Sequence, residues 1–430
     1  MRAFAEIVWL ELRSLVRSKA LATLLALAVA WMLALPGFIR SDGTAESARE
    51  LYVRFSLGGA FVLTLLALLA SATGSLARER AAHRLPLTMV RPVSRFSIAF
   101  GKIVAHVAVG ALVLSVAGAI LAGRSAVSRP CFHVVSPVLP SVREEARDLY
   151  ETYLRDPATP DALRRERPEV VLRLLEGQAL DRYQSIPTNV TAKWRFPGEA
   201  IRRLASPDAA CAVRMRLAAR FDMRRDVRGA FRLGAWQAPV SNITQAVLSV
   251  PLERASDGAF PEDELLFRND GGEALMLRPR RDLALLVRAD SFGWNLVRSC
   301  VALLAILAVA VSFGVFLSAG LGRPVALFAA VVTLVVGEMS PSVISSCPET
   351  LDSSVADRVG LAVTRVVAQV ARPVSAASPL EALANDERVE TGALLRLVVT
   401  DLAALPILLA WLAAVILPRK QEEGPFGIAC

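Results

Sequence analysis

The sequence predicts a membrane protein with six transmembrane helices and an extracytoplasmic α+β domain inserted between the third and the fourth. Two observations predict this fold class. Of the 430 residues, 54% are hydrophobic and only 21% are charged, which is more apolar than a soluble protein of this size. The apolar residues form separate blocks long enough to cross a bilayer, whereas residues 124–298 contain 28 Lys plus Arg and 23 Asp plus Glu.

The first predicted element is an amphipathic helix over residues 1–19 that lies in the membrane interface. Its apolar side chains recur with helical spacing, and charged side chains occupy the opposite face. Glu6 and Glu11 make it unlike the short basic start of a signal peptide. We therefore expect the apolar run of residues 20–39 to be an uncleaved first span.

Apolar runs define the transmembrane regions 20–123 and 299–418. The six predicted spans are 20–39, 55–77, 103–123, 299–322, 324–344 and 402–418. The apolar part of the fifth, residues 324–337, is short enough to be a re-entrant segment if it stood alone.

Basic residues near span ends indicate which side of the membrane is cytoplasmic. With six spans, residues 1–19, the basic loop 78–102 and the tail 419–430 are all cytoplasmic, and a helical segment over 345–395 lies outside. Five spans would put the basic residues of the tail outside. The parity of the spans therefore favours counting residues 324–344 as a complete span.

Residues 124–298 are predicted to form the extracytoplasmic domain, helical over 141–185 and a β-sandwich over 190–292. Apolar and polar residues alternate from 211 to 224, which predicts a strand with one buried and one cationic face. That cationic face suits an anionic ligand, and it equally suits a solvated sheet face in an arginine-rich protein.

Three details of this domain are also predicted. A strand is expected over 227–236, and "NDGG" at 269–272 predicts a hairpin between strands over 264–268 and 274–278. Cys131 and Cys211 can form a disulfide in an oxidising compartment, or they are two independent small apolar residues.

Motifs of enzyme chemistry are missing from the sequence. It contains no GxxxxGK[ST], no HExxH and no GxSxG, so we predict neither catalysis nor a cofactor or metal on this chain. No basic stripe interleaved with aromatic residues favours a nucleic acid. Glu338 and Asp401 are acids near span ends, where they are candidate functional groups or simply reach the membrane surface.

The loop 78–102 carries six basic residues and a single acid, Glu79. An Arg-Pro pair at 91 and 92 predicts a helix break, and Ser94 is placed to cap the helix that follows. Positive charge alone would fix membrane topology. Topology does not require this turn, so the loop is also a candidate docking site for a cytoplasmic protein.

This loop resembles the cytoplasmic coupling segment in the permease subunit of type-2 ATP-binding-cassette transporters. The residues that carry the resemblance are Arg78, Glu79, Arg84, Arg91, Pro92, Val93, Ser94, Arg95, Gly101 and Lys102. "WLELRSLVRSKAL" near the start and the stretch from "SPLEALANDER" to "LPRK" are similar to the opening and closing segments of that family. Two features depart from it, namely His83-Arg84 before Leu85 and an insertion of about 175 residues after the third span.

The resemblance implies a bacterial inner-membrane protein that forms a homodimer or heterodimer and pairs with a cytoplasmic P-loop ATPase, which holds the ATP. Arg84, Arg91 and Arg95 would then contact acids on that ATPase. Two functions remain open. One is the permease of an exporter. The other is a non-transporting adaptor that relays ATPase motion to a periplasmic protein or ligand through the large insertion.

Overall fold

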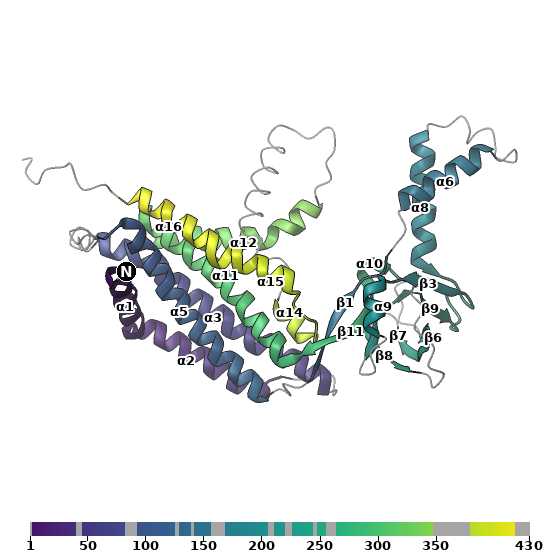
Figure 1. Ribbon diagram of the computed structural model, residues 1–430, viewed down its shortest axis with the longest axis horizontal. Coiled ribbons are helices and arrows are strands. Elements are labelled where there is room, and N and C mark those ends of the chain that lie inside the picture. Colours follow the sequence, from purple (N-terminus) through teal and green to yellow (C-terminus); the bar gives the residue numbers. More distant parts are fainter. Residues whose placement is uncertain are drawn as a thin grey trace, which may run out of the picture. The chain divides into compact units, whose positions relative to one another are not determined.

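A computed structural model describes the chain as two units. One unit contains residues 1–129 and 291–430 and the other contains residues 130–290; we call them the helical unit and the sheet unit (Figure 1). The residues that the structure describes are 2–39, 45–81, 93–124, 129–138, 142–155, 168–204, 210–219, 226–243, 247–254, 264–346 and 379–417.

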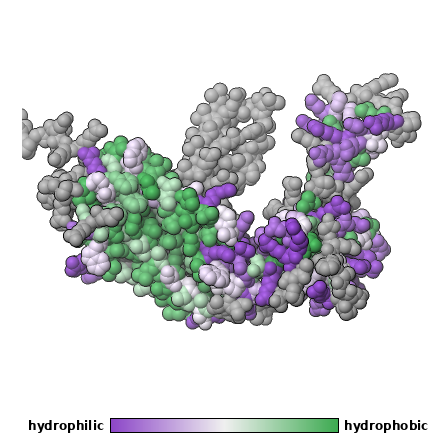
Figure 2. Space-filling view, viewed as in Figure 1, coloured by the Kyte–Doolittle hydropathy of each residue, from purple (hydrophilic) through white to green (hydrophobic). Residues whose placement is uncertain are grey.

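Long and short helices build the helical unit. They are α1 (Arg2–Arg17), α2 (Lys19–Ala34), α3 (Ala45–Ala81), α5 (Arg95–Arg124), α11 (Phe292–Gly320), α12 (Arg323–Ser346), α14 (Pro379–Ala384), α15 (Thr391–Leu397) and α16 (Leu405–Ile416). A short 3-10 turn η1 (Leu35–Gly37) follows α2, and a π-helical segment η2 (Val398–Ala404) joins α15 to α16. Figure 2 shows a broad hydrophobic surface over this unit. Leu66, Phe328 and Trp411 are among the exposed apolar side chains of the unit.

Four of the described helices are long and apolar enough to cross a membrane. They cover residues Ser47–Ala81, Arg95–Arg124, Phe292–Gly320 and Thr391–Ile416. The pair formed by α1 and α2 would add a fifth, but it bends by 66°. The helix over Arg323–Val336 is apolar and shorter. Six spans are therefore not confirmed.

Small residues let the central helices approach closely. A Cβ added to Gly110 on α5 would lie 2.7 Å from Leu307 on α11, and a Cβ added to Gly314 on α11 would lie 3.1 Å from Ala72 on α3. Buried Ser and Thr hydroxyls in these helices donate to backbone carbonyls three or four residues earlier, as Ser312 does to Ala308 at 2.6 Å. The helices α3, α5 and α11 thus form a tightly packed core.

One end of the helical unit is closed by the segment that contains α14. The buried Asn295 of α11 donates to the Glu387 carbonyl at 2.6 Å and accepts from the Val389 N–H at 2.8 Å. Arg49 at the start of α3 forms a two-pronged ion pair with Asp386. These bonds hold residues distant in the sequence at one end of α3 and α11.

The sheet unit is built around one eight-stranded sheet with the order β1-β11-β4-β8-β7-β6-β9-β3. Its strands are β1 (Pro130–Val135), β3 (Thr191–Arg195), β4 (Cys211–Arg216), β6 (Asp226–Leu233), β7 (Trp236–Ile243), β8 (Val247–Arg254), β9 (Glu264–Asn269) and β11 (Leu283–Ser291). A second sheet has the order β2-β10-β5, formed by β2 (Ser185–Ile186), β10 (Leu275–Met276) and β5 (Ala218–Ala219). The sheet unit also contains two short helices, α9 (Gly198–Leu204) and α10 (Pro279–Asp282).

Both sheets contribute to a single buried core. Met215 of β4 and Phe267 of β9 lie in the same cluster as Ile186 of the small sheet. Phe231 and Phe267 face each other at the centre, with ring centroids 4.8 Å apart. The large sheet thus forms a continuous half-barrel, and a β-sandwich is not confirmed.

The structure corrects three strand predictions. The strand expected over 211–224 ends at Arg216, and Ala218–Ala219 pairs in the other sheet. The strand expected over 227–236 ends at Leu233, because the backbone turns at Gly234, where φ is 54°, and returns as β7. The hairpin expected at "NDGG" is wrong, since β9 pairs with β6 and β3, whereas β10 pairs with β2 and β5.

A helical hairpin of α6 (Val142–Arg155) and α8 (Pro168–Gln184) belongs to the same unit. It has its own small cluster of buried Ala146, Val171 and Leu175, separate from the core of the sheets. This hairpin corresponds to the helical segment predicted over 141–185. Cys131 and Cys211 are both buried thiols on β1 and β4, which β11 separates.

Candidate functional site

The candidate site lies where α1, the last turn of α3 and the first turns of α5 meet. We call it the basic end of the helical unit, defined by Arg78, Arg80, Arg95, Lys102 and Arg323. At its centre the Lys102 ammonium lies 2.8 Å from Glu11 Oε2 and 2.7 Å from Glu79 Oε1. Lys102 is only 3% exposed, so one buried cation joins three helices.

The carboxylates of Glu11 and Glu79 stabilise the charged Lys102 side chain in its buried position. A lone buried ammonium would be strongly disfavoured, whereas a paired and hydrogen-bonded one is tolerated. Burial raises the pKa of the Glu11 carboxyl, but the charge and hydrogen bond of Lys102, together with smaller contributions that include the charge of Arg78, place the pKa below its ordinary value of 4.5. Glu11 is therefore ionised at neutral pH and ties α1 to α5.

His106 extends the polar cluster one turn further along α5. Its Nδ1 lies 2.8 Å from the Lys102 carbonyl oxygen and its Nε2 lies 3.3 Å from the Ser71 hydroxyl. A carbonyl oxygen can only accept, so Nδ1 carries a proton, and in the neutral ring Nε2 accepts from Ser71. The imidazole therefore joins α5 to α3 next to the buried lysine.

Gly101 allows α1 to lie directly on α5. A Cβ at this position would lie 2.9 Å from the Ile7 side chain, so any larger residue would push α1 away. Phe4 stacks on Phe100, with ring centroids 6.0 Å apart. The Gly101-Lys102 pair thus provides both a flat contact surface and an ionic bond for α1.

Two arginines of the basic end bind the final carbonyl groups of distant helices. Arg80 donates to the Leu321 carbonyl at the end of α11 at 2.6 Å, and Arg95 donates to the Leu417 carbonyl at the end of α16 at 3.1 Å. Free carbonyls at a helix C-terminus carry partial negative charge. These arginines therefore join the flanks of the loop to the second half of the helical unit.

The structure places the other predicted coupling residues as follows. Arg84, Arg91 and Pro92 lie outside the described residues, and so do His83 and Leu85. Val93 and Ser94 directly precede α5. The Ser94 hydroxyl accepts from the Ser97 N–H at 3.1 Å, which confirms the predicted cap. Arg78, Glu79, Arg95, Gly101 and Lys102 gather at the basic end.

The two predicted membrane acids do not belong to this site. Asp401 is buried in the π-helical segment η2, where Oδ1 lies 2.9 Å from the Thr400 hydroxyl. Glu338 belongs to α12, and its side chain lies outside the described residues. Within the described residues no group of three His, Cys, Asp or Glu side chains is arranged to hold a metal.

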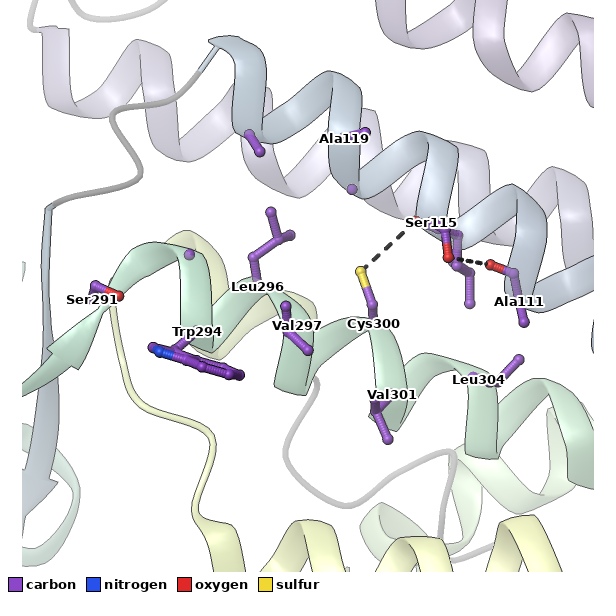
Figure 3. A pocket seen from close by; sticks show the side chains of 14 residues that line it. Ala111, Ser115, Ala119, Ser291, Trp294, Leu296, Val297, Cys300, Val301 and Leu304 are labelled. Atoms are coloured by element: carbon purple, nitrogen blue, oxygen red, sulfur yellow. Dashed lines mark hydrogen bonds between the residues drawn. The ribbon is translucent and has the colours of Figure 1, made fainter.

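A groove of about 650 Å³ runs between α5 and α11 (Figure 3). Small and apolar side chains line it, including Ala111, Ala119 and Leu304, with Trp294 near one end. The Cys300 thiol points across it, 3.9 Å from the Leu114 carbonyl. No charged residue lines this groove, so it offers mainly apolar contact.

Sequence reasoning missed the contribution of three residues to this site, namely Glu11, Arg80 and Arg323. Glu11 falls on the apolar stripe of the first helix, spaced from Ile7 and Leu15 by four residues each, and an acid in such a stripe is a signal of a buried partner. Arg80 was treated as part of the loop charge only. Nothing in the sequence around Arg323 indicates that it meets α3.

Comparisons with protein-family models, with curated proteins and with solved structures find no match to this chain.

Proposed function

We propose that the chain is the permease subunit of a type-2 ATP-binding-cassette exporter in a bacterial inner membrane. It would have six spans, both termini in the cytoplasm and residues 124–298 outside as a sandwich-like domain. It would form a homodimer or heterodimer, and a cytoplasmic P-loop ATPase would dock on the loop 78–102. The observation that carries the proposal is the ionic bond of Lys102 to both Glu11 and Glu79.

That bond is what a coupling segment needs mechanically. A partner that pushes on the loop must move the spans rather than bend the loop. Removing one partner of a buried charge pair typically lowers the stability of a protein by about 3–5 kcal/mol. With Lys102 holding α1, α3 and α5 together, a force on the loop would be transmitted to all three helices.

The docking contacts themselves would come from Arg84 and Arg91. Arg95, the third predicted contact, already donates to the Leu417 carbonyl. Charge reversal at the first two residues would therefore test docking without disturbing the described hydrogen bonds.

The test is affinity purification of the full-length chain from its native membrane. We expect a P-loop ATPase to co-purify with the wild-type chain and to be lost from Arg84→Glu/Arg91→Glu. The matched control is Arg228→Glu/Arg232→Glu, which reverses two exposed arginines on β6 and should retain the ATPase. If no P-loop ATPase accompanies the wild-type chain, or if the loop variant keeps it, the proposal is wrong.

An adaptor that transports nothing is the second candidate, and one observation favours it. β11 ends at Ser291 and α11 begins at Phe292, so no linker separates a strand of the sheet unit from a predicted span. Motion of α11 would then reach the sheet directly.

Distances inside the sheet unit separate the two candidates. Spin labels at Thr152 on α6 and Gln237 on β7 would report such motion. An adaptor predicts that ATP changes their separation in the assembled complex, whereas a permease predicts an unchanged separation and ATP-dependent cargo movement. A constant separation, with the ATPase bound and active, would exclude the adaptor.

A further inference from the structure

Three arginines gather where the end of α3 meets the turn between α11 and α12. We call Arg78, Arg80 and Arg323 the arginine cluster. The Nε atoms of Arg78 and Arg323 each lie 3.2 Å from the point that a Cβ on Gly74 would occupy, so they are within about 6.4 Å of each other (twice 3.2 Å). Arg80 reaches the same turn through the Leu321 carbonyl.

Within the described part of the chain the cluster has no acid of its own: the charge of Arg78 helps to lower the pKa of the Glu11 carboxyl, but Glu11 is bonded to Lys102. The ion pairs there include none of its three guanidinium groups. Glu79, the neighbour in sequence, is bonded to Lys102. The Nε of Arg80 is buried without a hydrogen-bond partner.

Cations at this spacing repel each other, and the repulsion grows as water is excluded. A bound anion would reverse it and would also accept the unused N–H donors. Guanidinium groups match phosphate particularly well, because their planar donors form two parallel bonds to its oxygens.

The surroundings of the cluster place it at the edge of the apolar surface. Arg323 is the first residue of α12, and Val325, Phe328 and Val332 on that helix are 54%, 71% and 41% exposed. Exposed apolar side chains of this kind face acyl chains, so the arginines at their end lie at the depth of lipid phosphates.

We infer that the arginine cluster binds the phosphate group of an anionic phospholipid. Acidic residues of a partner protein are the competing occupant. The exposed apolar start of α12 favours a lipid, since a soluble protein would leave that surface uncovered. The inference does not depend on the proposed ATPase, because the purified chain alone tests it.

The experiment is native mass spectrometry of the purified chain after incubation with phosphatidylglycerol or with phosphatidylcholine. We expect one phosphatidylglycerol to be retained selectively by the wild-type chain. Arg78→Gln/Arg323→Gln should weaken its retention by about tenfold for each lost guanidinium. Arg78→Lys/Arg323→Lys keeps both charges but loses the two-pronged geometry, and should retain the lipid partly.

Matched controls separate binding from folding and from other sources of phosphate. Arg124→Gln removes an exposed arginine at the other end of α5 and should leave retention unchanged. Gel filtration and thermal unfolding must match the wild type in each variant. Inorganic phosphate should compete only weakly, and competition as strong as that of the lipid would indicate a site for a soluble anion. Equal retention of both lipids, or unchanged retention in the Gln variant, would overturn the inference.

Discussion

Replacing Lys102 by Met should release α1 from the rest of the helical unit. The substitution keeps the volume of the side chain but removes the charge between Glu11 and Glu79. Their side chains are 14% and 30% exposed, so water can reach them only in part. Removing one partner from a buried ionic group costs about 3–5 kcal/mol, and partial exposure favours the lower end of that range.

A loss of about 3 kcal/mol in the free energy that holds α1 in place increases the population of molecules with α1 detached by roughly a hundredfold. When opening and closing are fast, the rate of proteolysis follows that population. We therefore expect trypsin to cleave the Lys102→Met variant about a hundredfold faster at Arg13 and Arg17, two exposed basic residues of α1. Mass spectrometry of the fragments measures the rate.

Two comparison variants make the result decisive. Lys193→Met removes an exposed lysine from β3 and should leave cleavage of α1 unchanged. Glu11→Gln/Glu79→Gln/Lys102→Met removes all three charges and should restore slow cleavage, because a neutral cluster leaves no unpaired ion. Wild-type cleavage in Lys102→Met, or fast cleavage in the neutral variant, would refute the ionic account.

Three further outcomes are expected. Asn295→Leu removes both backbone bonds of a buried amide and should lower stability by about 2 kcal/mol, measured by thermal unfolding in lipid nanodiscs. Burial raises the pKa of the Cys211 thiol to about 12, so maleimide should label it only after denaturation. The depressed pKa of Glu11 contributes stability that is full above pH 4.5 and lost as the pH falls below that value, measured by hydrogen exchange of α1.

Each of these outcomes has a matched comparison. Ser299→Ala, which loses only a 3.3 Å bond to the Pro379 carbonyl, should cost less than Asn295→Leu. A cysteine placed at the exposed Gln237 should react with maleimide without denaturation. Glu11→Gln should remove the acid-dependent step in exchange. Equal effects in a variant and its comparison would contradict the corresponding prediction.

The positions of the long helices follow from the sequence because their apolar runs are local signals. The run of residues 103–123 lies within α5, and the cap at Ser94 is a contact between neighbours in the chain. Pairing partners are not local. Asn269 was predicted to start a hairpin, yet its buried amide donates to the Ile186 and Pro187 carbonyls, residues far upstream.

The basic end shows the same limit for function. Composition reveals six basic residues in the loop, but it cannot show that Lys102 is paired with two carboxylates, while Arg78 and Arg323 form no ion pair among the described residues. β7 was missed for a related reason. Pro239 lies within it, opposite Ala230, and proline in a sequence argues against an interior strand.

The chain leaves the helical unit and returns to it at one point. The Phe292 N–H donates to the Arg129 carbonyl at 2.8 Å, and the sheet unit of residues 130–290 lies between them in sequence. The sheet unit is therefore inserted between two backbone positions of the helical unit that are hydrogen-bonded to each other. Joining Arg129 to Ser291 through a short glycine linker should leave a helical protein. The contacts of Arg80 and Arg95 at one end, and of Arg49 and Asn295 at the other, should remain. Other domains whose two ends lie close together could be inserted between the same two positions.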